Sequence, residues 1–292
     1  GLGDVYKRQV RVALAKIKRQ SDDLSCLLGG DLLNQIISSG FAAREIRAPF
    51  IGLYGACSTI SEGLMLGGML VDGGFAELAA CAASSHFSAA ERQFRYPLEM
   101  GVQAVPSSQR TVTGAGSIII QAAGEFRPGA GNVFEHVALT GGTIGSVEDF
   151  GITDANNMGA AMAPAAFKTI KTHLSDYSRR VEDYDRIITG DLGIFGSDML
   201  YELLRGEGIE IADRHEDCGK LMFSPEQNVN CGASGCGCAA TVMSSWFLPK
   251  IESGEIRRVL FLATGALMSP VSSLQGESIP SIAHAVVIEH ID

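Results

Sequence analysis

Hydrophobic and polar positions along the chain follow two periods, one typical of buried strands and one typical of amphipathic helices. Apolar runs bounded by glycine, proline or polar residues predict strands at residues 24–31, 49–54, 78–83, 111–121 and 187–191. Apolar residues spaced three or four apart predict helices at residues 10–18, 34–47, 60–71 and 164–177. Strands that alternate with helices indicate parallel βαβ units, so we expect a layered α/β fold.

Residues 1–9 do not lead into the pattern that follows them. We interpret this stretch as an adaptor-derived leader that lies outside the fold. The first half then begins at Val10, in the tail of an amphipathic helix that runs to Lys18. We therefore expect the natural start of the protein to be missing from the sequence.

The second half of the chain repeats the order of the first. The string Gly-Asp-Leu at residues 30–32 recurs at residues 190–192, an offset of 160 residues. The turn Gly-Ala-Cys-Ser at residues 55–58 corresponds to Gly-Ala-Ser-Gly at residues 232–235, an offset of 177. Later strings recur at offsets of 180, 181 and 169, and ordered matches of this kind indicate an internal duplication.

The duplication divides the chain into two similar halves, residues 10–123 and residues 124–292. We expect them to stack in the order α/β/α/β/α, with the first half truncated at its start. The offset falls from 181 to 169, so the first half holds about 12 extra residues between Ser84 and Arg110. Long connections inside compact domains are usually functional or disordered, and this one carries His86 and two arginines. We favour a functional role for it.

Cys57 lies in a Gly-Ala-Cys turn between a predicted strand and a predicted helix. A helix start offers unpaired amides and the positive end of the macrodipole, which favour a thiolate. Thiolases and ketoacyl synthases present their nucleophile in this way, and the two duplicated halves resemble the thiolase fold. The alternative is that Cys57 is a buried structural cysteine.

A condensing enzyme of this fold also needs a base or hydrogen-bond donors from its second half, usually two histidines or a histidine and an asparagine. The positions that correspond to those histidines hold Asp191 and Val229 here. The position of the second thiolase cysteine, near Thr264-Gly-Ala266, holds no cysteine. The sequence therefore predicts that the fold is retained and that the condensing chemistry is lost.

Other candidate residues have more than one interpretation. His284 lies in the last turn and could reach a cleft shared by the halves, or it could be structural. His215 lies in a polar loop, where a surface position is favoured. Cys231, Cys236 and Cys238 are spaced C-x₄-C-x-C, which is not a standard zinc pattern, so we predict no metal site.

Arg92 and Arg95 lie three residues apart beside Tyr96. Guanidinium groups bind carboxylates through two parallel hydrogen bonds, so this arrangement suits an anionic ligand. The alternative is that both arginines form ion pairs at the surface.

The composition narrows the functional classes. The chain has 23 basic and 33 acidic residues, and this net charge of −10 argues against nucleic acid as a partner and provides no polybasic anchor for anionic lipid. No apolar run approaches the roughly 18 residues of a membrane-spanning helix. The seven cysteines are odd in number and lie mostly in apolar or glycine-rich runs, which is typical of reduced thiols in an intracellular protein.

Several strings together resemble the stage V sporulation protein AD family of endospore-forming bacteria. They are Gly30-Asp-Leu-Leu-Asn-Gln35, Gly55-Ala-Cys-Ser-Thr59, Ser84-Ser-His86 with Ala90-Glu-Arg-Gln-Phe-Arg-Tyr-Pro97, Gly151-Ile-Thr-Asp154 with Ala161-Met-Ala-Pro-Ala-Ala166, and Ala263-Thr-Gly-Ala-Leu267. The resemblance runs from about Asp22 to Glu289. It implies that part of the family's amino-terminal region, including the first strand of the first half, is absent.

The resemblance implies a catalytically degenerate thiolase-like protein that binds dipicolinic acid (pyridine-2,6-dicarboxylate) and needs no cofactor. Such a protein works with membrane proteins of the same uptake system to load the acid, with calcium, into the developing spore. It is expected inside that spore, peripheral to the inner membrane. A planar dianion needs cations, hydroxyls and helix-end amides around an apolar slot, which the lost acyl site could supply. The expected ligand-binding residues, with Cys57 as a vestigial nucleophile, are Cys57, Ser58, Ser85, His86, Arg92, Arg95, Ser234, Cys236 and His284.

The resemblance also implies a homodimer formed through the first half. Its last predicted strand, at residues 116–121, would otherwise leave an apolar edge exposed. Two other functions stay open at this point. One is an active acyltransferase that uses Cys57 with His284 or His86, and the other is an assembly protein whose pocket is vestigial.

Overall fold

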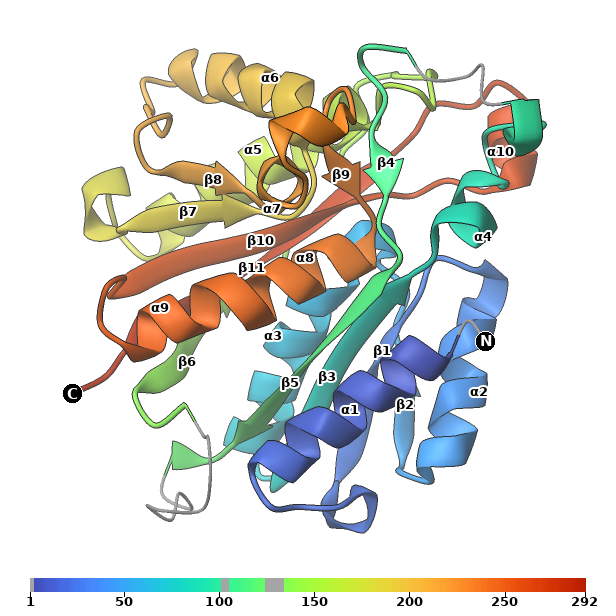
Figure 1. Ribbon diagram of the computed structural model, residues 1–292. Coiled ribbons are helices and arrows are strands. Elements are labelled where there is room, and N and C mark those ends of the chain that lie inside the picture. Colours follow the sequence, from blue (N-terminus) through green and yellow to red (C-terminus); the bar gives the residue numbers. More distant parts are fainter. Residues whose placement is uncertain (1–2, 101–104, 124–133) are drawn as a thin grey trace.

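The computed structural model describes residues 3–100, 105–123 and 134–292, which form five layers in the order helix, sheet, helix, sheet, helix (Figure 1). The first sheet has the strand order β2 (Phe50–Gly52), β1 (Cys26–Gly30), β3 (Leu78–Ser85) and β5 (Gly114–Gln121). The second sheet has the order β6 (Val137–Thr143), β11 (Ser281–His290), β10 (Arg258–Ala266), β7 (Arg186–Thr189) and β8 (His215–Asp217). The predicted layered α/β fold is confirmed.

Helices cover both faces of each sheet (Figure 1). The outer layers hold α1 (Asp4–Lys16) and α2 (Ile37–Ile46) in the first half, and α5 (Met158–Asp176) and α6 (Gly193–Arg205) in the second. The middle layer holds α3 (Thr59–Asp72) and α8 (Cys236–Val242). Helix α8 continues through a π-helical turn (Met243–Phe247) into α9 (Leu248–Glu252). The connections contain α4 (Phe87–Glu91), α7 (Cys218–Leu221), α10 (Pro270–Leu274) and a small sheet of β4 (Arg110–Thr111) and β9 (Ala233–Ser234).

The central strands are mostly apolar because both of their faces are buried. Along β3, Ala80 and Ala82 belong to the apolar cluster under α1 and α2. Ala79 and Cys81, which alternate with them, belong to the cluster between the two sheets. A third cluster lies between the second sheet and the helices α5 and α6. The five layers are therefore held by three separate cores.

The two sheets repeat the same connections. In each half a parallel pair, β1 with β3 or β7 with β10, is followed by an antiparallel strand, β5 or β11. Asp31 follows β1 and Asp191 follows β7, so the predicted duplication is confirmed. In addition β11 pairs with β6, which has no counterpart beside β5 in the described part of the first half. The boundary predicted after residue 123 borders residues 124–133, which lie outside the described residues.

The amino-terminal helix differs from the prediction. It begins at Asp4 rather than Val10, and Tyr6 on its inner face has no solvent exposure. Val10 and Leu14 continue the same buried face at intervals of four residues. The boundary predicted at Val10 therefore differs from the helix, which includes the stretch from Asp4 onward, and the adaptor origin of residues 1–9 stays a prediction. The apolar period that starts at Tyr6 was the signal that could have corrected it.

The segment predicted as one strand at residues 111–121 forms two elements. The strand β4 pairs with β9 of the second half, and β5 begins only at Gly114. Gly116 lets α8 pack directly on β5, since a Cβ at this position would lie 2.3 Å from Ala240 O. The extra segment of the first half therefore leads into a direct connection between the two halves.

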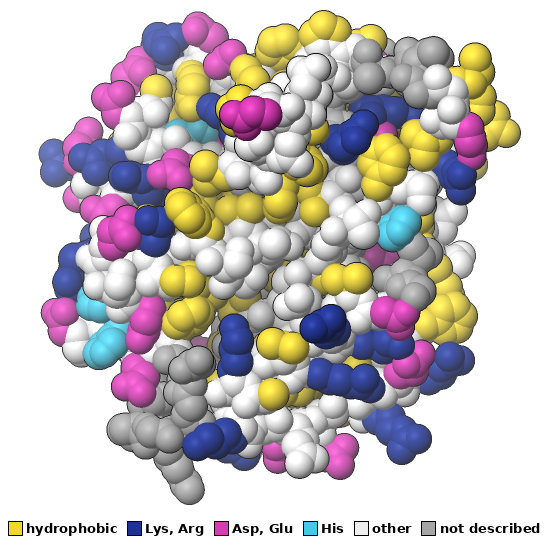
Figure 2. All heavy atoms as spheres, viewed as in Figure 1, with side chains coloured by type: hydrophobic (Ala, Val, Ile, Leu, Met, Phe, Trp, Pro, Cys, Tyr) yellow, Lys and Arg dark blue, Asp and Glu magenta, His cyan; other side chains and the backbone are white. Residues whose placement is uncertain are grey.

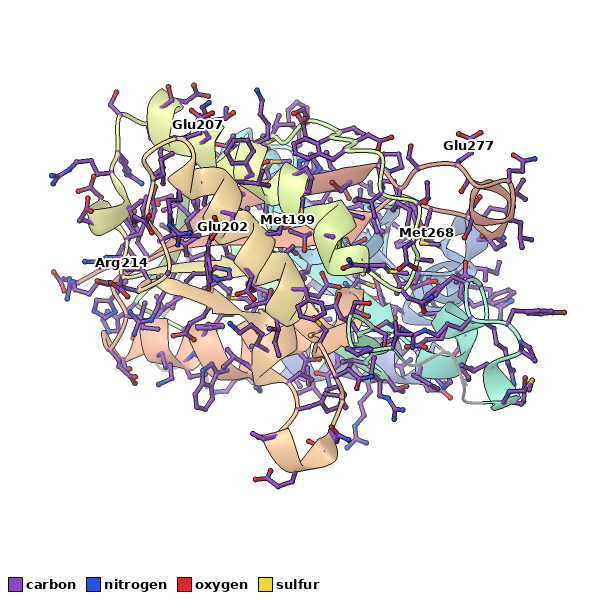
Figure 3. The ribbon with its side chains drawn as sticks, turned by 90° about the horizontal axis from the view of Figure 1, so that it is seen from above. Met199, Glu202, Glu207, Arg214, Met268 and Glu277 are labelled. Atoms are coloured by element: carbon purple, nitrogen blue, oxygen red, sulfur yellow. The ribbon has the colours of Figure 1, made fainter. Side chains whose placement is uncertain are left out.

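The outer face of the second half is closed by α5 and α6, which Figure 3 shows from above. Met199 of α6 packs against the apolar cluster, whereas Glu202 is exposed and pairs with Arg205 (Figure 3). The helix predicted at residues 164–177 is present but begins earlier, at Met158, where the Asn157 side chain accepts a hydrogen bond from the backbone.

Candidate functional site

Cys57 lies where the two halves meet, in a short 3₁₀ turn (Ala56–Ser58) that leads directly into α3. Ser58 Oγ donates to Gly55 O at 2.6 Å and fixes the turn, so this predicted ligand-binding hydroxyl is used internally. The strand β10 of the second half lies against the turn at Gly265, where a Cβ would lie 2.1 Å from Gly55 O. Only 8% of Cys57 is exposed. The predicted position at a helix start is confirmed, and the site is closed.

Asp191 faces Cys57 from the second half. Its carboxylate is completely buried and accepts hydrogen bonds from Gly235 N at 2.9 Å, from Thr264 Oγ1 at 3.1 Å and from the Cys57 thiol. Burial raises the pKa of Asp191 to about 7, because loss of water disfavours the charged form more than these donors favour it. A carboxyl group therefore stands beside the thiol, at the position where a condensing enzyme is expected to carry a histidine.

The environment of Cys57 keeps its thiol protonated. Burial raises the pKa of Cys57 well above its ordinary value, and the neighbouring Asp191 raises it further. The Gly235 amide lowers the pKa of this thiol by a smaller amount. The prediction that the helix start favours a thiolate is therefore wrong, because desolvation outweighs the helix dipole at a closed site.

No histidine in the described residues forms a hydrogen bond with Cys57 or Asp191. His284 lies on β11, opposite Ala263, and its Nδ1 accepts a hydrogen bond from Gly145 N at 3.1 Å. Burial lowers the pKa of His284. The structure therefore gives His284 a backbone contact within the second half and not a contact with the cysteine.

His215 was expected at the surface, and this prediction is wrong. It is 8% exposed on β8, where Nε2 bonds to Thr189 Oγ1 and Nδ1 bonds to Tyr201 OH, both at 2.7 Å. Burial lowers the pKa of His215 to about 3, so the ring stays neutral at physiological pH. The polar sequence around His215 gave no strand signal, although this segment forms the short strand β8, which α6 covers.

Two residues that the sequence did not indicate hold Asp191 in place. Asp217 Oδ2 accepts from Leu192 N at 2.8 Å and Oδ1 accepts from Gly193 N at 3.0 Å, which fixes the loop after β7. Gln109 Nε2 donates to the backbone oxygen of Asp191 at 2.6 Å and to Ala233 O at 2.8 Å. Gln109 belongs to the extra segment of the first half, so the length of that segment was the available signal.

Three more of the predicted residues line the junction between the halves. Ser85 Oγ donates to Val112 O at 2.6 Å and accepts from Gly237 N at 3.1 Å. Cys236 Sγ donates to Ser84 O at 2.9 Å at the start of α8. Ser234 lies on β9, next to the Gly235 amide that binds Asp191. The Ser85 and Cys236 side chains join the halves through hydrogen bonds to protein atoms.

A narrow cleft opens beside this junction, at the carboxyl ends of β1 and β3. Its lining residues come from the ends of these strands and from α2 and α4, and they are Asp31, Leu32, Leu33, Ser38, Ser84, Ser85, His86, Ala89 and Ala90. Ser38 Oγ is buried and has no hydrogen-bond partner in the described structure. Ligands of open α/β sheets bind at the carboxyl ends of strands, so this cleft is a candidate ligand site. Its volume of about 10 Å³ has room for about one water molecule, so a larger ligand requires the lining residues to move apart.

The two predicted arginines have different environments. Arg95 is 9% exposed, and its guanidinium donates to Glu91 Oε2 at 2.6 Å and to Gln109 O at 3.0 Å. Arg92 is exposed and pairs with Glu99, which is exposed as well. Arg95 is therefore committed to a buried carboxylate of its own chain, whereas Arg92 remains accessible to a ligand.

The remaining thiols do not form a metal site in the described part of the chain. All seven cysteines are free and buried, and Cys231 Sγ accepts a hydrogen bond from Phe195 N at 3.2 Å. The described residues contain no group of three or more histidines, cysteines or acids arranged to hold a metal ion. Within the same residues, no helix combines the length and the apolar character required to span a bilayer.

Comparisons with known proteins place the chain in a defined sequence family. A model of the family described as stage V sporulation protein AD (SpoVAD) matches residues 4–289. Stage V sporulation protein AD of Bacillus subtilis (strain 168) is 45% identical over 280 residues, which cover 96% of this chain and 80% of the relative.

Solved structures with the same architecture are much more distant in sequence. The 3-oxoacyl-(acyl carrier protein) synthase III of Pseudomonas aeruginosa PAO1 has a TM-score of 0.59 at 13% identity, and the match covers 100% of this chain and 84% of that one. The corresponding synthase III of Aquifex aeolicus VF5 has a TM-score of 0.61 at 10% identity, with 99% and 85% covered. These likenesses establish a thiolase-like fold.

Proposed function

The chain belongs to the stage V sporulation protein AD family, and on that premise we propose that it binds dipicolinic acid and does not transfer acyl groups. In this role it supports the uptake of calcium dipicolinate into the developing spore, together with membrane proteins of the same system and from a position peripheral to the inner spore membrane. The observation that carries the proposal is the pairing of Cys57 with a carboxyl group, Asp191, in place of a histidine.

Acyl transfer at Cys57 would meet two physical obstacles. The thiol is protonated, and the buried Asp191 raises its pKa instead of stabilising a thiolate. Condensation also develops negative charge on an oxyanion, whose stabilisation by a hydrogen-bond donor contributes about 3 kcal/mol per donor. The ionised form of Asp191 would repel that charge. A retained fold with this pair therefore supports a binding role.

Dicarboxylate binding needs fixed donors, and the segment around α4 supplies them. His86 lies at the start of α4 and lines the cleft, and its Nδ1 lies 3.3 Å from Ser88 Oγ. The first amides of a helix lack acceptors within the helix and favour anions; in α4 the Phe87 amide already donates to Thr113 Oγ1 at 3.0 Å, so the donors for a ligand are the Ser88 and Ala89 amides. Arg92 follows α4, and its exposed pair with Glu99 contributes little stability, so a ligand carboxylate can replace Glu99. We assign the two ligand carboxylates to Arg92 and to the His86 end of this helix.

Acyl-CoA chemistry tests the non-catalytic half of the proposal. The purified chain is expected to show no cleavage of acetoacetyl-CoA above the rate of Cys57→Ala, because its thiol stays protonated in a closed site. Iodoacetamide should label Cys57 slowly in the folded protein and rapidly in urea. Thioester cleavage that disappears in Cys57→Ala would contradict the proposal.

We also propose a homodimer formed through β5. Within the described residues this strand pairs with β3 alone, and Ile118 and Ile120 on it are partly buried. An open strand edge is a template for pairing with a second chain, and the equivalent edge of the second sheet is covered by β6. Sedimentation velocity at micromolar concentration is expected to give a dimer. A stable monomer would contradict this proposal and leave dipicolinate binding to be judged separately.

A further inference from the structure

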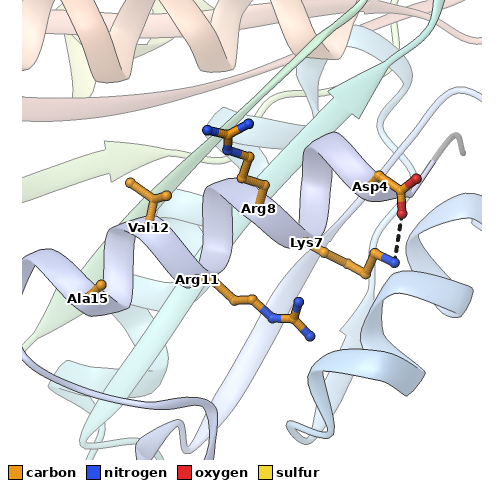
Figure 4. Close-up of a pocket in the computed structure, with 6 residues that line it drawn as sticks. All are labelled: Asp4, Lys7, Arg8, Arg11, Val12 and Ala15. Atoms are coloured by element: carbon orange, nitrogen blue, oxygen red, sulfur yellow. Dashed lines mark ion pairs between the residues drawn. The ribbon is translucent and has the colours of Figure 1, made fainter.

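The surface has a second hollow besides the cleft at the ends of β1 and β3. It lies along α1, where Lys and Arg side chains gather on the face shown in Figure 2, and it measures about 440 Å³ (Figure 4). Its lining residues are Asp4, Lys7, Arg8, Arg11, Val12 and Ala15. Half of them lie in the stretch before Val10 that we interpret as an adaptor-derived leader, so we assign no ligand to this hollow. The closed cleft is therefore the place that a ligand has to open.

One turn beside this cleft has a strained backbone. Gln35 (φ 58°, ψ 21°) and Ile36 (φ 48°, ψ 41°) are both in the left-handed region, which disfavours residues other than glycine. Among the described residues they are the only consecutive non-glycine pair of this kind, and Ile36 is the only β-branched member. Strained residues of this type are frequent at ligand clamps and switch regions. Asn34 and Gln35 are exposed at the tip of the turn, so nothing buried has to move with them.

The ends of the turn are held by specific contacts. A Cβ on Gly52 of β2 would lie 2.4 Å from Ile36 Cδ1, and one on Gly30 would lie 3.3 Å from Ile36 Cγ2, so the Ile36 side chain packs on the first sheet. At the other end, Gln93 Nε2 donates to Leu32 O at 2.9 Å and joins the turn to the segment after α4. These contacts keep the strained conformation in place.

The turn forms one wall of the cleft and encloses a hydroxyl that has no partner. Leu33 and Ser38, on either side of the strained pair, both line the cleft. Ser38 is 7% exposed, and its Oγ has no hydrogen-bond partner in the described structure. The next hydroxyl, Ser39 Oγ, donates to Asp31 at 2.6 Å. A group that enters the cleft would satisfy Ser38, but the closed cleft has no room for more than about one water molecule.

The opposite wall of the cleft, which includes α4, is fixed. At the start of this helix Phe87 N donates to Thr113 Oγ1 at 3.0 Å. At its end Glu91, which has no solvent exposure, accepts from Thr111 N at 2.8 Å and from Arg95 Nη1 at 2.6 Å. A larger ligand therefore has to displace the strained turn and not α4.

We propose that residues 33–36 form a gate, which is closed in this structure and swings outward to admit a ligand to Ser38. In the closed form Gln35 and Ile36 are held in the left-handed region, and opening releases both of them. This strain opposes the contacts of Ile36 and lowers the cost of opening, so that a ligand with a higher affinity for the open form shifts the population toward it. The proposal rests on the proposed function only for the identity of the ligand, a planar dicarboxylate.

Labelling of an introduced thiol measures opening without any ligand. All seven native cysteines are buried, and Ser38→Cys breaks no hydrogen bond, so the extra labelling by iodoacetamide relative to the unmodified chain reports the open fraction. Adding Gln35→Gly relieves the strain of the closed form and should slow this labelling at least about fivefold, because the left-handed conformation disfavours a non-glycine residue by that factor or more. Gln35→Asn should act in the same direction, since asparagine tolerates this conformation. Gln93→Ala removes the bond to Leu32 O and should speed the labelling.

Arg47→Gly is the matched control for Gln35→Gly. Arg47 is an exposed left-handed residue (φ 65°) at the other end of α2, so glycine relieves the same kind of strain away from the cleft and should leave the labelling of Ser38→Cys unchanged. Equal labelling with and without Gln35→Gly, or equal slowing by Arg47→Gly, would overturn the gate.

Stopped-flow binding of dipicolinate separates the gate from the identity of the ligand. In a chain that keeps Ser38, Gln35→Gly should slow the association of dipicolinate by about the factor seen in labelling. An association rate that Gln35→Gly leaves unchanged would overturn the gate and keep the proposed ligand. Labelling that responds as expected in a chain that binds no dipicolinate would support the gate and contradict the proposed ligand.

Discussion

Replacement of Arg95 by alanine is expected to lower the free energy of unfolding by about 3–5 kcal/mol. The guanidinium neutralises Glu91, which has no solvent exposure, and it also donates to Gln109 O at 3.0 Å. The second oxygen of Glu91 accepts from Thr111 N at 2.8 Å, so the carboxylate cannot turn toward water. The variant would leave a buried charge without its counterion, and urea unfolding measures the loss.

Arg92→Ala is the matched control, since the two arginines lie on the same segment. Its pair with Glu99 is exposed at both ends, so the free energy of unfolding should change by less than about 1 kcal/mol. Similar small losses in both variants would contradict the structural role assigned to Arg95. The comparison also matters for ligand studies, because weak binding by an Arg95 variant would report local unfolding and not a lost ligand contact.

Asp191→Asn is expected to change how stability depends on pH. The pKa of Asp191 is raised from 3.8 to about 7, so between pH 4 and pH 7 the folded chain holds a proton that the unfolded chain releases. The stability of the unmodified protein therefore falls as the pH rises through this window and becomes level above it. The asparagine variant lacks this contribution, and the difference between the two proteins should change by up to about 4 kcal/mol from pH 4 to pH 8.

Urea unfolding of both proteins across this pH range measures the difference. Titrating groups distant from Asp191 are shared and cancel in the comparison, whereas Asp217, whose pKa is also raised by burial, interacts with Asp191 and contributes to the difference. Asp213→Asn removes a carboxylate from an exposed position and controls for the change in net charge. A difference between the unmodified protein and Asp191→Asn that does not vary with pH would show that Asp191 is not the buried acid described here.

The fold could be predicted from the sequence because its signals are local and repeated. Each half repeats an apolar strand, a Gly-Asp turn and an amphipathic helix, and the recurrence of Asp31 as Asp191 located equivalent strand ends. The start of α1 was predicted too late because residues 1–9 were interpreted as a leader, although Tyr6 belongs to the same apolar period as Val10 and Leu14.

The candidate site was less accessible to sequence reasoning because burial decides its chemistry. Cys57 was correctly placed at a helix start, but the sequence did not reveal that β10 closes the turn and that desolvation outweighs the dipole. His215 and Arg95 are polar residues in polar stretches, which suggested exposure. His215 is buried because Thr189, 26 residues earlier, satisfies it, and a pair so distant in sequence leaves no periodic signal. Arg95 is satisfied by Glu91, four residues earlier, and by Gln109 O.

Calorimetric titration of dipicolinate into the full chain tests the central claim most directly. Binding is expected in the unmodified protein, and Arg92→Ala should weaken it by about 1.5–3 kcal/mol, the usual range for a hydrogen bond to a charged group. Cys57→Ala should alter affinity only through packing, and Arg180→Ala, an exposed arginine of the second half, should leave it unchanged. Absence of binding by the folded protein, or equal affinity in the unmodified protein and in an Arg92→Ala, His86→Ala variant, would contradict the account.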